Sequence, residues 1–316
     1  MKLSKDYIWP VIGVFAVVLS IWLLVKQLRN ISLDDVLASF AAVPHHHWLM
    51  ATVCTLLAFG ALAGYDRIAL QHLRRKVPLG FVCATSFTTY ALAHNIGASV
   101  VSGALVRYRA YSSKGLSAAE VGVLVALCSF TFALAGIALG GVVLLLHPEL
   151  LGYFWQDFPV AGSYAIGAGM LLFTALYVLG SALNLPPLKI RSFVLRYPRL
   201  RIVSQQLLVG PAEILGAAGI IYFALPMDSN PGYLVVLGIF LASFSAALLS
   251  HAPGGLGVLE VMFFIALPDI NQADLLAALL IFRLFYFIVP FAISIVLVAL
   301  FERANIARFI QQRTRS

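Results

Sequence analysis

Long apolar runs dominate the chain and are separated by short polar connections. About 20 apolar residues are needed to cross a bilayer as a helix. Six uninterrupted runs approach or exceed that length, and they cover residues 8–25, 48–66, 118–146, 160–183, 207–225 and 275–301. The first run is too long for a signal peptide and no small-residue cleavage site follows it, so we expect a retained helix. The pattern predicts an all-α, polytopic membrane protein.

Two further apolar regions, 79–105 and 232–268, are interrupted near their middles. The first interruption carries His94, Asn95 and Gly97, and the second reads His-Ala-Pro-Gly-Gly-Leu-Gly-Val-Leu-Glu at residues 251–260. Backbone that leaves the helix at membrane depth is tolerated only where protein or a water-filled cavity satisfies its polar groups. Both interruptions therefore mark places where the helix breaks for a reason.

The distribution of lysine and arginine decides how the interrupted regions cross. The basic connections are 67–76, 107–114, 189–201 and the tail 303–315, whereas 147–159, 226–231 and 269–274 contain no lysine or arginine. Basic connections face the cytoplasm. All of them do so only if each interrupted region dips into the membrane and returns to the side it came from. We expect six full transmembrane helices plus two re-entrant helical hairpins, with both termini cytoplasmic; eight simple crossings with kinked helices remain the alternative.

This topology contains two copies of one unit in opposite orientation. Residues 48–146 form the first repeat and 207–301 the second, each with a helix, a dip and a helix. Inverted repeats with interrupted helices near the midplane are common in transporters. We expect a single integral membrane domain over 1–316. Its other parts are an N-terminal helix and external loop (1–47), a connector with helix 160–183 and a basic loop (147–206), and a basic tail (302–316).

Composition supports this class and argues against others. The chain is 61% hydrophobic and 11% charged, against about 25% charged residues in soluble domains. Its net charge of +8 is better explained by cytoplasmic loops and anionic lipid headgroups than by nucleic acid. Cys54, Cys83 and Cys128 lie in apolar runs, which argues against disulfides or a zinc site. We expect no cofactor, no metal and no enzyme activity, because no nucleotide-binding, zinc-protease or similar motif occurs.

Basic and aromatic residues alternate where the first interrupted region ends. Arg107 and Arg109 are interleaved with Tyr108 and Tyr111. Arginine forks match phosphate oxygens, and tyrosine suits the headgroup level. The segment is either a phospholipid headgroup site or an ordinary positive-inside loop. Asn95 and Ser99, in the dip itself, either hydrogen-bond a headgroup or cap the broken helix.

Glu260 and Arg283 are ionisable residues inside apolar segments, which makes them functional candidates by default. We expect them to form an ion pair across the second dip, and either to bind a lipid headgroup there or to serve as a buried structural pair. His251 precedes the break and either titrates or packs. Glu213 either faces the same cavity or lies at the inner interface. The expected hinge residues are Pro253, Gly254, Gly255 and Gly257.

Two other pairs of polar residues have local explanations. Ser117 and Glu120 fit a capping box at the start of the run 118–146, and Asp66 and Arg67 offer a local pair at the end of the run 48–66.

At these motifs the chain resembles a known family. The segment 251–260, the run Phe-Arg-Leu-Phe-Tyr-Phe-Ile-Val-Pro at 282–290 and the run Gly-Ala-Leu-Val-Arg-Tyr-Arg-Ala-Tyr at 103–111 are similar to the lysylphosphatidylglycerol synthase transmembrane-region family, most closely to its standalone YbhN-like inner-membrane members. The resemblance implies a bacterial inner-membrane protein that handles phospholipids. It places the Pro-Gly-Gly break, Glu260, Arg283, Arg107 and Arg109 at motif positions, and Tyr286 lies in the same run as Arg283. Lysyl transfer is not expected, because no soluble synthase domain follows the membrane region.

Three functions are compatible with these features. The first is a phospholipid translocator of the flippase or scramblase type, with the headgroup between the two dips and anionic headgroups as the preferred ligands. The second is a proton- or ion-coupled transporter of a small solute. The third is a non-catalytic membrane partner of a lipid-synthesising enzyme. Besides phospholipids, the candidate partners are such an enzyme and a second copy of the chain.

Overall fold

The computed structural model describes residues 32–96, 99–183, 188–190, 193–195, 198–250 and 255–300. The predicted first helix at 8–25, the basic tail, His251, Pro253 and Gly254 lie outside this part of the chain. Ser99 begins a described helix, but its side chain is outside the description.

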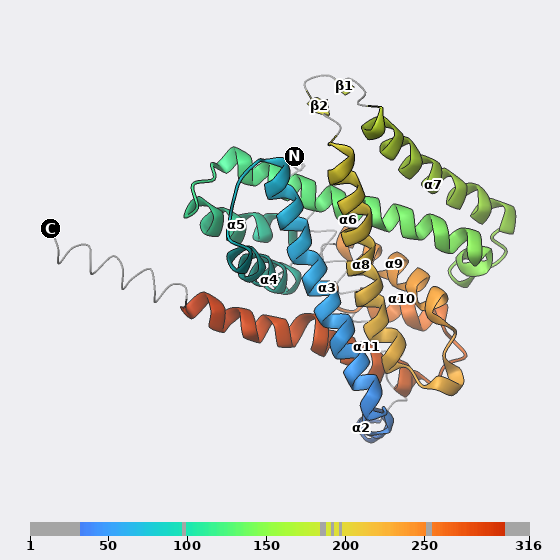
Figure 1. Cartoon of the computed structure of the whole chain (residues 1–316). Helices are drawn as coiled ribbons and strands as arrows, with labels where there is room; N and C mark the ends of the chain where they lie inside the picture. Colours follow the sequence, from blue (N-terminus) through green and yellow to red (C-terminus); the bar gives the residue numbers. More distant parts are fainter. Residues whose placement is uncertain are drawn as a thin grey trace, which may run out of the picture.

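The regular secondary structure of the described residues is helical apart from two short antiparallel strands (Figure 1). The α-helices are α2 (Leu33–Ala42), α3 (His45–His72), α4 (Leu79–Ile96), α5 (Ser99–Ser112), α6 (Ala118–Leu146), α7 (Val160–Ala182), α8 (Leu200–Ala224), α9 (Tyr233–Ser250), α10 (Val258–Ala266) and α11 (Gln272–Arg283). Short 3-10 turns occur at η1 (Pro148–Tyr153) and η2 (Met227–Ser229), and a π-helix, η4, at Leu284–Ile288. Strands β1 (Leu188–Ile190) and β2 (Phe193–Leu195) pair antiparallel within the predicted basic loop.

Six helices are long and apolar enough to cross a membrane, which confirms the predicted all-α, multi-pass class. They are α3, α6, α7, α8, α9 and the helix that runs from Gln272 through the π-turn to Leu300. Five of them contain the predicted crossings. The sixth, α9, was expected to be one leg of a half-crossing dip, yet its 18 residues span about 27 Å at 1.5 Å per residue.

Both interrupted regions fold as helical hairpins. A β-carbon at Gly103 in α5 would lie 3.4 Å from the Thr89 side chain and 3.5 Å from that of Ala93 in α4. In the second region a β-carbon at Gly255 would lie 2.8 Å from the Ala247 side chain of α9. Residues separated by eight to fourteen positions approach this closely only if the chain reverses. The second reversal uses glycine at a positive φ, +60° at Gly255 and +79° at Gly257, where a side chain is disfavoured.

Helices α3 and α8 lie side by side at the centre of the molecule (Figure 1). Glycines bring the two backbones together: a β-carbon would lie 2.7 Å from Cys54 Sγ at Gly219, 3.0 Å from the Ala58 nitrogen at Gly216, and 2.6 Å from Val209 at Gly64. Contact positions rise along α3 as they fall along α8, so the helices are antiparallel. They begin the two predicted repeats, and opposite directions are what inverted repeats require.

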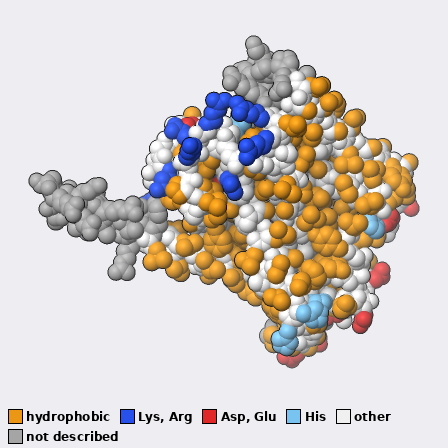
Figure 2. All heavy atoms as spheres, in the orientation of Figure 1, with side chains coloured by type: hydrophobic (Ala, Val, Ile, Leu, Met, Phe, Trp, Pro, Cys, Tyr) orange, Lys and Arg blue, Asp and Glu red, His pale blue; other side chains and the backbone are white. Residues whose placement is uncertain are grey.

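Charged side chains separate toward different ends of the molecule. Lysines and arginines gather around the end of α3 and the start of α6, and acidic residues lie mainly at the lower and right edges of the view (Figure 2). Exposed members of the basic group are Arg67, Arg74, Arg75, Lys76 and Lys114; exposed acidic residues away from it include Asp34, Asp157, Asp228 and Asp269. Apolar side chains cover the surface between, as expected of a lipid-facing belt.

The start of α6 has the predicted capping box. Ser117 Oγ accepts from the Glu120 nitrogen at 3.3 Å, and Glu120 Oε2 accepts from the Ser117 nitrogen at 2.8 Å. Glu120 also accepts from Arg75 Nε at 2.7 Å. The cap therefore fixes where the basic loop ends and the membrane helix begins.

Candidate functional site

The π-helix at Leu284–Ile288 is the point where the two hairpins meet. A π-turn widens the helix by one residue and turns side chains and carbonyls in new directions. Arg283 directly precedes the π-helix, and Tyr286 and Phe287 are its third and fourth residues. Each of these three residues contacts a different part of the core, as described next.

Arg283 and Glu260 form the ion pair that the sequence predicts. Arg283 Nε donates to Glu260 Oε1, and the second guanidinium nitrogen Nη2 lies 3.4 Å from the carbonyl oxygen of Gly255. Glu260 Oε2 accepts from the Gly257 nitrogen at 2.9 Å, so the same carboxylate closes the first turn of α10. The side chains are 11% and 5% exposed. Arg283 thus connects α11 to the turn of the second hairpin, and we call this group the Glu260 cluster.

The end of α4, in the first hairpin, contacts the same π-helix. Asn95 Nδ2 donates to the Phe287 carbonyl at 3.2 Å and to the Ala91 carbonyl at 2.8 Å. Both hydrogen bonds are to backbone carbonyls, which fits the predicted capping role of Asn95 rather than a headgroup contact. His94 stacks on Tyr286 with ring centroids 5.4 Å apart and meets Phe244 of α9 edge-on at 6.3 Å. Residues from both hairpins therefore contact one five-residue segment.

Glu213 of α8 is held by two tyrosine hydroxyls. Tyr286 Oη lies 2.5 Å from Glu213 Oε1, and Tyr65 Oη of α3 lies 3.4 Å from Oε2. The glutamate is 2% exposed and both tyrosines are buried. The sequence left two positions open for Glu213, facing a cavity or lying at the inner interface. The structure has it at neither position, because it is buried in the core. We call these three residues the Glu213 cluster.

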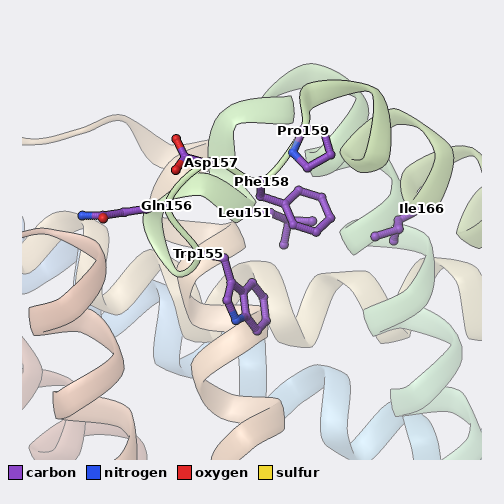
Figure 3. A pocket seen from close by; sticks show the side chains of 7 residues that line it. All are labelled: Leu151, Trp155, Gln156, Asp157, Phe158, Pro159 and Ile166. Atoms are coloured by element: carbon purple, nitrogen blue, oxygen red, sulfur yellow. The ribbon is translucent and has the colours of Figure 1, made fainter.

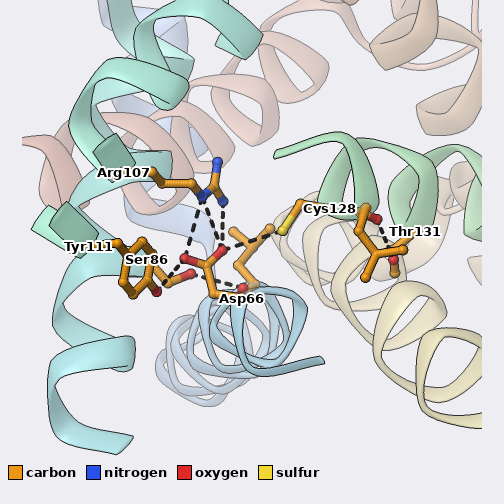
Figure 4. Close-up of polar contacts among 8 residues, drawn as sticks. Asp66, Ser86, Arg107, Tyr111, Cys128 and Thr131 are labelled. Atoms are coloured by element: carbon orange, nitrogen blue, oxygen red, sulfur yellow. Dashed lines mark hydrogen bonds and ion pairs between the residues drawn. The ribbon is translucent and has the colours of Figure 1, made fainter. Parts of the chain in front are cut away.

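Asp66 of α3 organises a second buried ion pair (Figure 4). Arg107 donates to Asp66 Oδ1 from Nη2 at 2.8 Å and from Nε at 3.2 Å. Tyr111 Oη donates to Oδ2 at 2.8 Å, and the Cys128 thiol lies 3.5 Å from Oδ1. The Tyr90 ring stands 4.6 Å from the guanidinium carbon of Arg107. These five residues, from α3, α4, α5 and α6, form the Asp66 cluster.

The Asp66 cluster changes the picture of the predicted basic motif. The local pair of Asp66 with Arg67 is wrong, because Asp66 binds Arg107 and Arg67 is exposed. Arg107 is only 4% exposed, so it points inward, whereas Tyr108 and Arg109 are exposed. One helical turn thus sends neighbouring residues to different environments, and only the latter two could meet a headgroup without rearrangement.

Aromatic rings connect the Asp66 and Glu213 clusters through the middle of the protein. Tyr65 meets Tyr90 at 6.4 Å, Tyr90 meets His94 at 5.6 Å, and His94 stacks on Tyr286. Because Tyr65 directly precedes Asp66 in α3, the Asp66 and Glu213 clusters share one helix turn. This aromatic layer is not among the features predicted from the sequence; its available signal is that Tyr65 and Tyr90 are tyrosines within apolar runs.

The structure also has an apolar pocket away from these clusters. Its volume is 520 Å³, and its walls come from η1, the following loop and the first two turns of α7. Figure 3 shows the side chains of Trp155, Phe158 and Leu151 that line the pocket, with Gln156 and Asp157 at the edge of the pocket. Aromatic residues at this level are common where a membrane protein meets headgroups.

Among the described residues, no three histidine, cysteine or carboxylate side chains come together as a metal-ligand set. The clusters consist of buried charges and hydroxyls. Carboxyl groups can exchange protons, and an arginine can exchange one anionic partner for another.

Comparison with known proteins places this architecture in a family. The profile described as the lysylphosphatidylglycerol synthase TM region matches residues 11–294. The uncharacterized protein slr0712 of Synechocystis sp. is 28% identical over 306 residues, which cover 96% of this chain and 95% of that protein. The inner membrane protein YbhN of Escherichia coli is 28% identical over 255 residues, covering 79% and 77%.

A third relative is longer than this chain. The phosphatidylglycerol lysyltransferase of Staphylococcus haemolyticus is 26% identical over 302 residues, which cover 93% of this chain but 34% of that enzyme. The similarity is thus confined to about a third of the lysyltransferase. The chain is a multi-pass membrane protein that belongs to the family of the lysylphosphatidylglycerol synthase transmembrane region, a membrane domain linked to lipid handling.

Proposed function

We propose that this chain moves phospholipids between the two leaflets of a bacterial inner membrane, with the headgroup passing between two re-entrant hairpins. The single observation that carries the proposal is the shared π-helix. Asn95 from the first hairpin binds the Phe287 carbonyl, and Arg283 four residues earlier binds Glu260 and lies near the Gly255 carbonyl in the second. Residues of both hairpins contact one irregular segment, and the family is linked to lipid handling. Together these observations suggest a polar crossing point for headgroups.

The opposite entry of the two hairpins is supported by the charges at their ends. The first hairpin lies between the basic stretch that ends at Lys76 and the basic residue Lys114. The second lies between Asp228 and Asp269. Under the positive-inside rule the first hairpin enters from the cytoplasm and the second from outside. On this topology both termini are cytoplasmic.

Arginine supplies the chemistry for a phosphate. Its guanidinium binds carboxylate and phosphate in the same forked geometry, so a headgroup phosphate can replace Glu260 on Arg283. A buried ion pair contributes little net stability once desolvation is counted, which lowers the cost of that exchange. Exposed Tyr108 and Arg109 stand where the first hairpin ends and suit an initial headgroup contact. His251, Ser99, and the hinge at Pro253 and Gly254 remain part of the proposed site.

The test is a lipid movement assay in reconstituted vesicles. Fluorescent phosphatidylglycerol is incorporated in both leaflets, and an impermeant reductant bleaches only what reaches the outer leaflet. We expect the protein to render the inner pool bleachable, and Arg283→Gln or Glu260→Gln to slow this by about 10- to 100-fold, since a hydrogen bond to a charged group contributes about 1.5–3 kcal/mol.

The matched control is Arg75→Gln, which removes an arginine–glutamate pair from the exposed loop before α4 and should leave the rate unchanged. Equal rates in the wild-type protein, both core variants and empty vesicles would contradict lipid movement by this chain. Solute uptake driven by a proton or ion gradient without lipid movement would favour the small-solute transporter. Stable co-purification with a lipid synthase and no intrinsic activity would favour the partner role.

A further inference from the structure

Glu213 is a buried carboxylate that the lipid pathway does not use. Asp66 and Glu260 are each bound to an arginine, Arg107 and Arg283. Within the described residues, the contacts of the Glu213 carboxylate are two phenol hydroxyls. A carboxylate at membrane depth without a cation is costly when charged, so Glu213 differs in kind from the other two acids.

The hydroxyl of Tyr65 is placed to serve Glu213 in either of two protonation states. It lies 3.4 Å from Glu213 Oε2 and also 3.4 Å from the carbonyl oxygen of Gly210. Tyrosine has one hydroxyl proton and can both donate and accept. Tyr65 can therefore donate to the carboxylate or turn its proton to the carbonyl one turn away.

We propose that Glu213 is an exchangeable proton-binding site, with Tyr65 and Tyr286 as the hydroxyls that satisfy it in both forms. When Glu213 is ionised, Tyr286 donates to Oε1 and Tyr65 donates to Oε2. When a proton binds Oε2, the new O–H donates to Tyr65 Oη, the Tyr65 proton turns to the Gly210 carbonyl, and Tyr286 still donates to Oε1. No buried polar atom of the cluster loses its partner, so the cost of an unsatisfied group is avoided in both states.

The neighbouring side chains allow Glu213 to bind a proton because none of them balances the negative charge of its carboxylate. The titratable side chains beside Tyr65 and Tyr286 are Tyr90 and His94 of α4 and Cys128 of α6. Tyr177, Tyr233 and Cys54 contact α8 elsewhere, at Gln206, Leu215 and Gly219. In the ion pairs Asp66–Arg107 and Glu260–Arg283, the charge of each arginine is balanced by its own carboxylate. None of these groups supplies a cation to Glu213.

His94 connects the Glu213 cluster to the end of α4. Its ring stacks on Tyr286, and its buried Nδ1 has no hydrogen-bond partner among the described residues. Since Tyr286 sits in the π-helix that both hairpins contact, a change in the Glu213 charge acts directly on the segment where they meet. Resting on the proposed lipid function, we infer that the proton gradient contributes to lipid movement through Glu213.

Infrared spectroscopy tests proton binding without requiring any transport. A protonated carboxylic acid has a carbonyl stretch that an ionised carboxylate lacks. The purified protein is therefore titrated over about pH 6–10, where carboxyls with ordinary pKa values stay ionised and give no acid band. We expect a pH-dependent acid band that is missing in Glu213→Gln and present in the control Glu149→Gln, an exposed residue of η1. Tyr65→Phe should move the titration midpoint to higher pH by about one unit, because the ionised form loses a charge-assisted hydrogen bond whereas the protonated form loses a weaker neutral one.

Several results would overturn the proposal. They are an acid band that persists in Glu213→Gln, a wild-type spectrum without a pH-dependent acid band, or a midpoint that Tyr65→Phe leaves in place. Loss of the band on adding sodium at constant pH would assign the site to sodium instead. Variants that fail to fold are identified by their amide bands, and Tyr65→Phe then carries the test alone.

Coupling is tested separately in the vesicle assay. An imposed pH gradient should change the lipid rate in the wild-type protein at least about threefold and leave Glu213→Gln unaffected. A titrating band with no lipid movement contradicts the proposed function and leaves proton binding intact. Lipid movement that is equal with and without the gradient contradicts the coupling alone.

Discussion

Removing one partner of the Asp66–Arg107 pair should destabilise the folded protein strongly. Asp66 is 0% exposed and Arg107 4%, so neither charge can turn to water when its partner is lost. In Arg107→Gln the carboxylate keeps the 2.8 Å bond from Tyr111 and the thiol contact at 3.5 Å, but it loses both guanidinium donors. Breaking such a buried pair costs about 3–5 kcal/mol.

The double variant separates charge from packing. Asp66→Asn combined with Arg107→Gln leaves two neutral amides that can hydrogen-bond to each other and to Tyr111. Because no unpaired charge remains, we expect the double variant to be less destabilised than the sum of the two single variants, by about 2 kcal/mol or more. That difference is the coupling energy of a double-mutant cycle.

The assay is chemical unfolding in detergent micelles, followed by tryptophan fluorescence and checked for reversibility. The matched control is the same pair of changes at Glu120 and Arg75, whose bond of 2.7 Å is solvent-facing and should leave the unfolding free energy unchanged. Additive single effects at Asp66 and Arg107, or an Arg107→Gln variant as stable as the control, would refute the argument that this ion pair is buried and coupled.

Two further predictions concern helix packing and the π-helix. Gly216→Ala should lower stability by about 1–3 kcal/mol, because its β-carbon would lie 2.7 Å from the Cys54 carbonyl; Gly169→Ala in α7, where nothing lies within 4 Å, should instead stabilise by about 0.5–1 kcal/mol, and equal unfolding midpoints would count against the α3–α8 contact. Asn95→Ala should speed amide hydrogen exchange in residues 284–288, measured by mass spectrometry, because the bond to the Phe287 carbonyl is lost; unchanged exchange there would mean that the first hairpin does not hold the π-helix.

Much of the fold follows from the sequence because membrane helices are long and apolar. Five predicted crossings lie in the helices that the structure describes, and the capping box at Ser117 and Glu120 placed the start of α6 correctly. Apolar length did not decide the role of α9, because the Pro-Gly-Gly sequence at 253–255 does not say how long the helix before it is. Its 18 residues are enough to span alone, and only the reversal at Gly255 makes it a hairpin leg.

An ion pair of the site was predictable where two opposite charges in apolar segments had few other possible partners. Glu260 and Arg283 pair because each needs compensation in an apolar segment, and the sequence offered few alternatives. Arg107 could not be assigned in that way. Arg109, two residues later, looks equivalent in the sequence, yet the rotation of α5 turns Arg107 toward Asp66, 41 residues earlier, and leaves Arg109 exposed. Helix rotation depends on tertiary packing, which apolar runs do not encode.

The tyrosines around Glu213 were missed for a related reason. In a run such as 48–66 a tyrosine reads as a core or interface residue, and Tyr65 and Tyr286 are 221 positions apart in the chain. Their meeting depends on the π-turn at 284–288, whose sequence Leu-Phe-Tyr-Phe-Ile has no glycine or proline to signal irregular backbone.

The most direct measurement is the side of the membrane on which each end of each hairpin lies. After the native cysteines are replaced, single cysteines are introduced by Arg75→Cys and Lys114→Cys for the first hairpin and by Asp228→Cys and Asp269→Cys for the second. Each variant is labelled with an impermeant thiol reagent in right-side-out and inside-out vesicles. The account predicts that positions 75 and 114 label from the cytoplasmic side and positions 228 and 269 from the opposite side. Labelling of the two ends of either hairpin from different sides would contradict it.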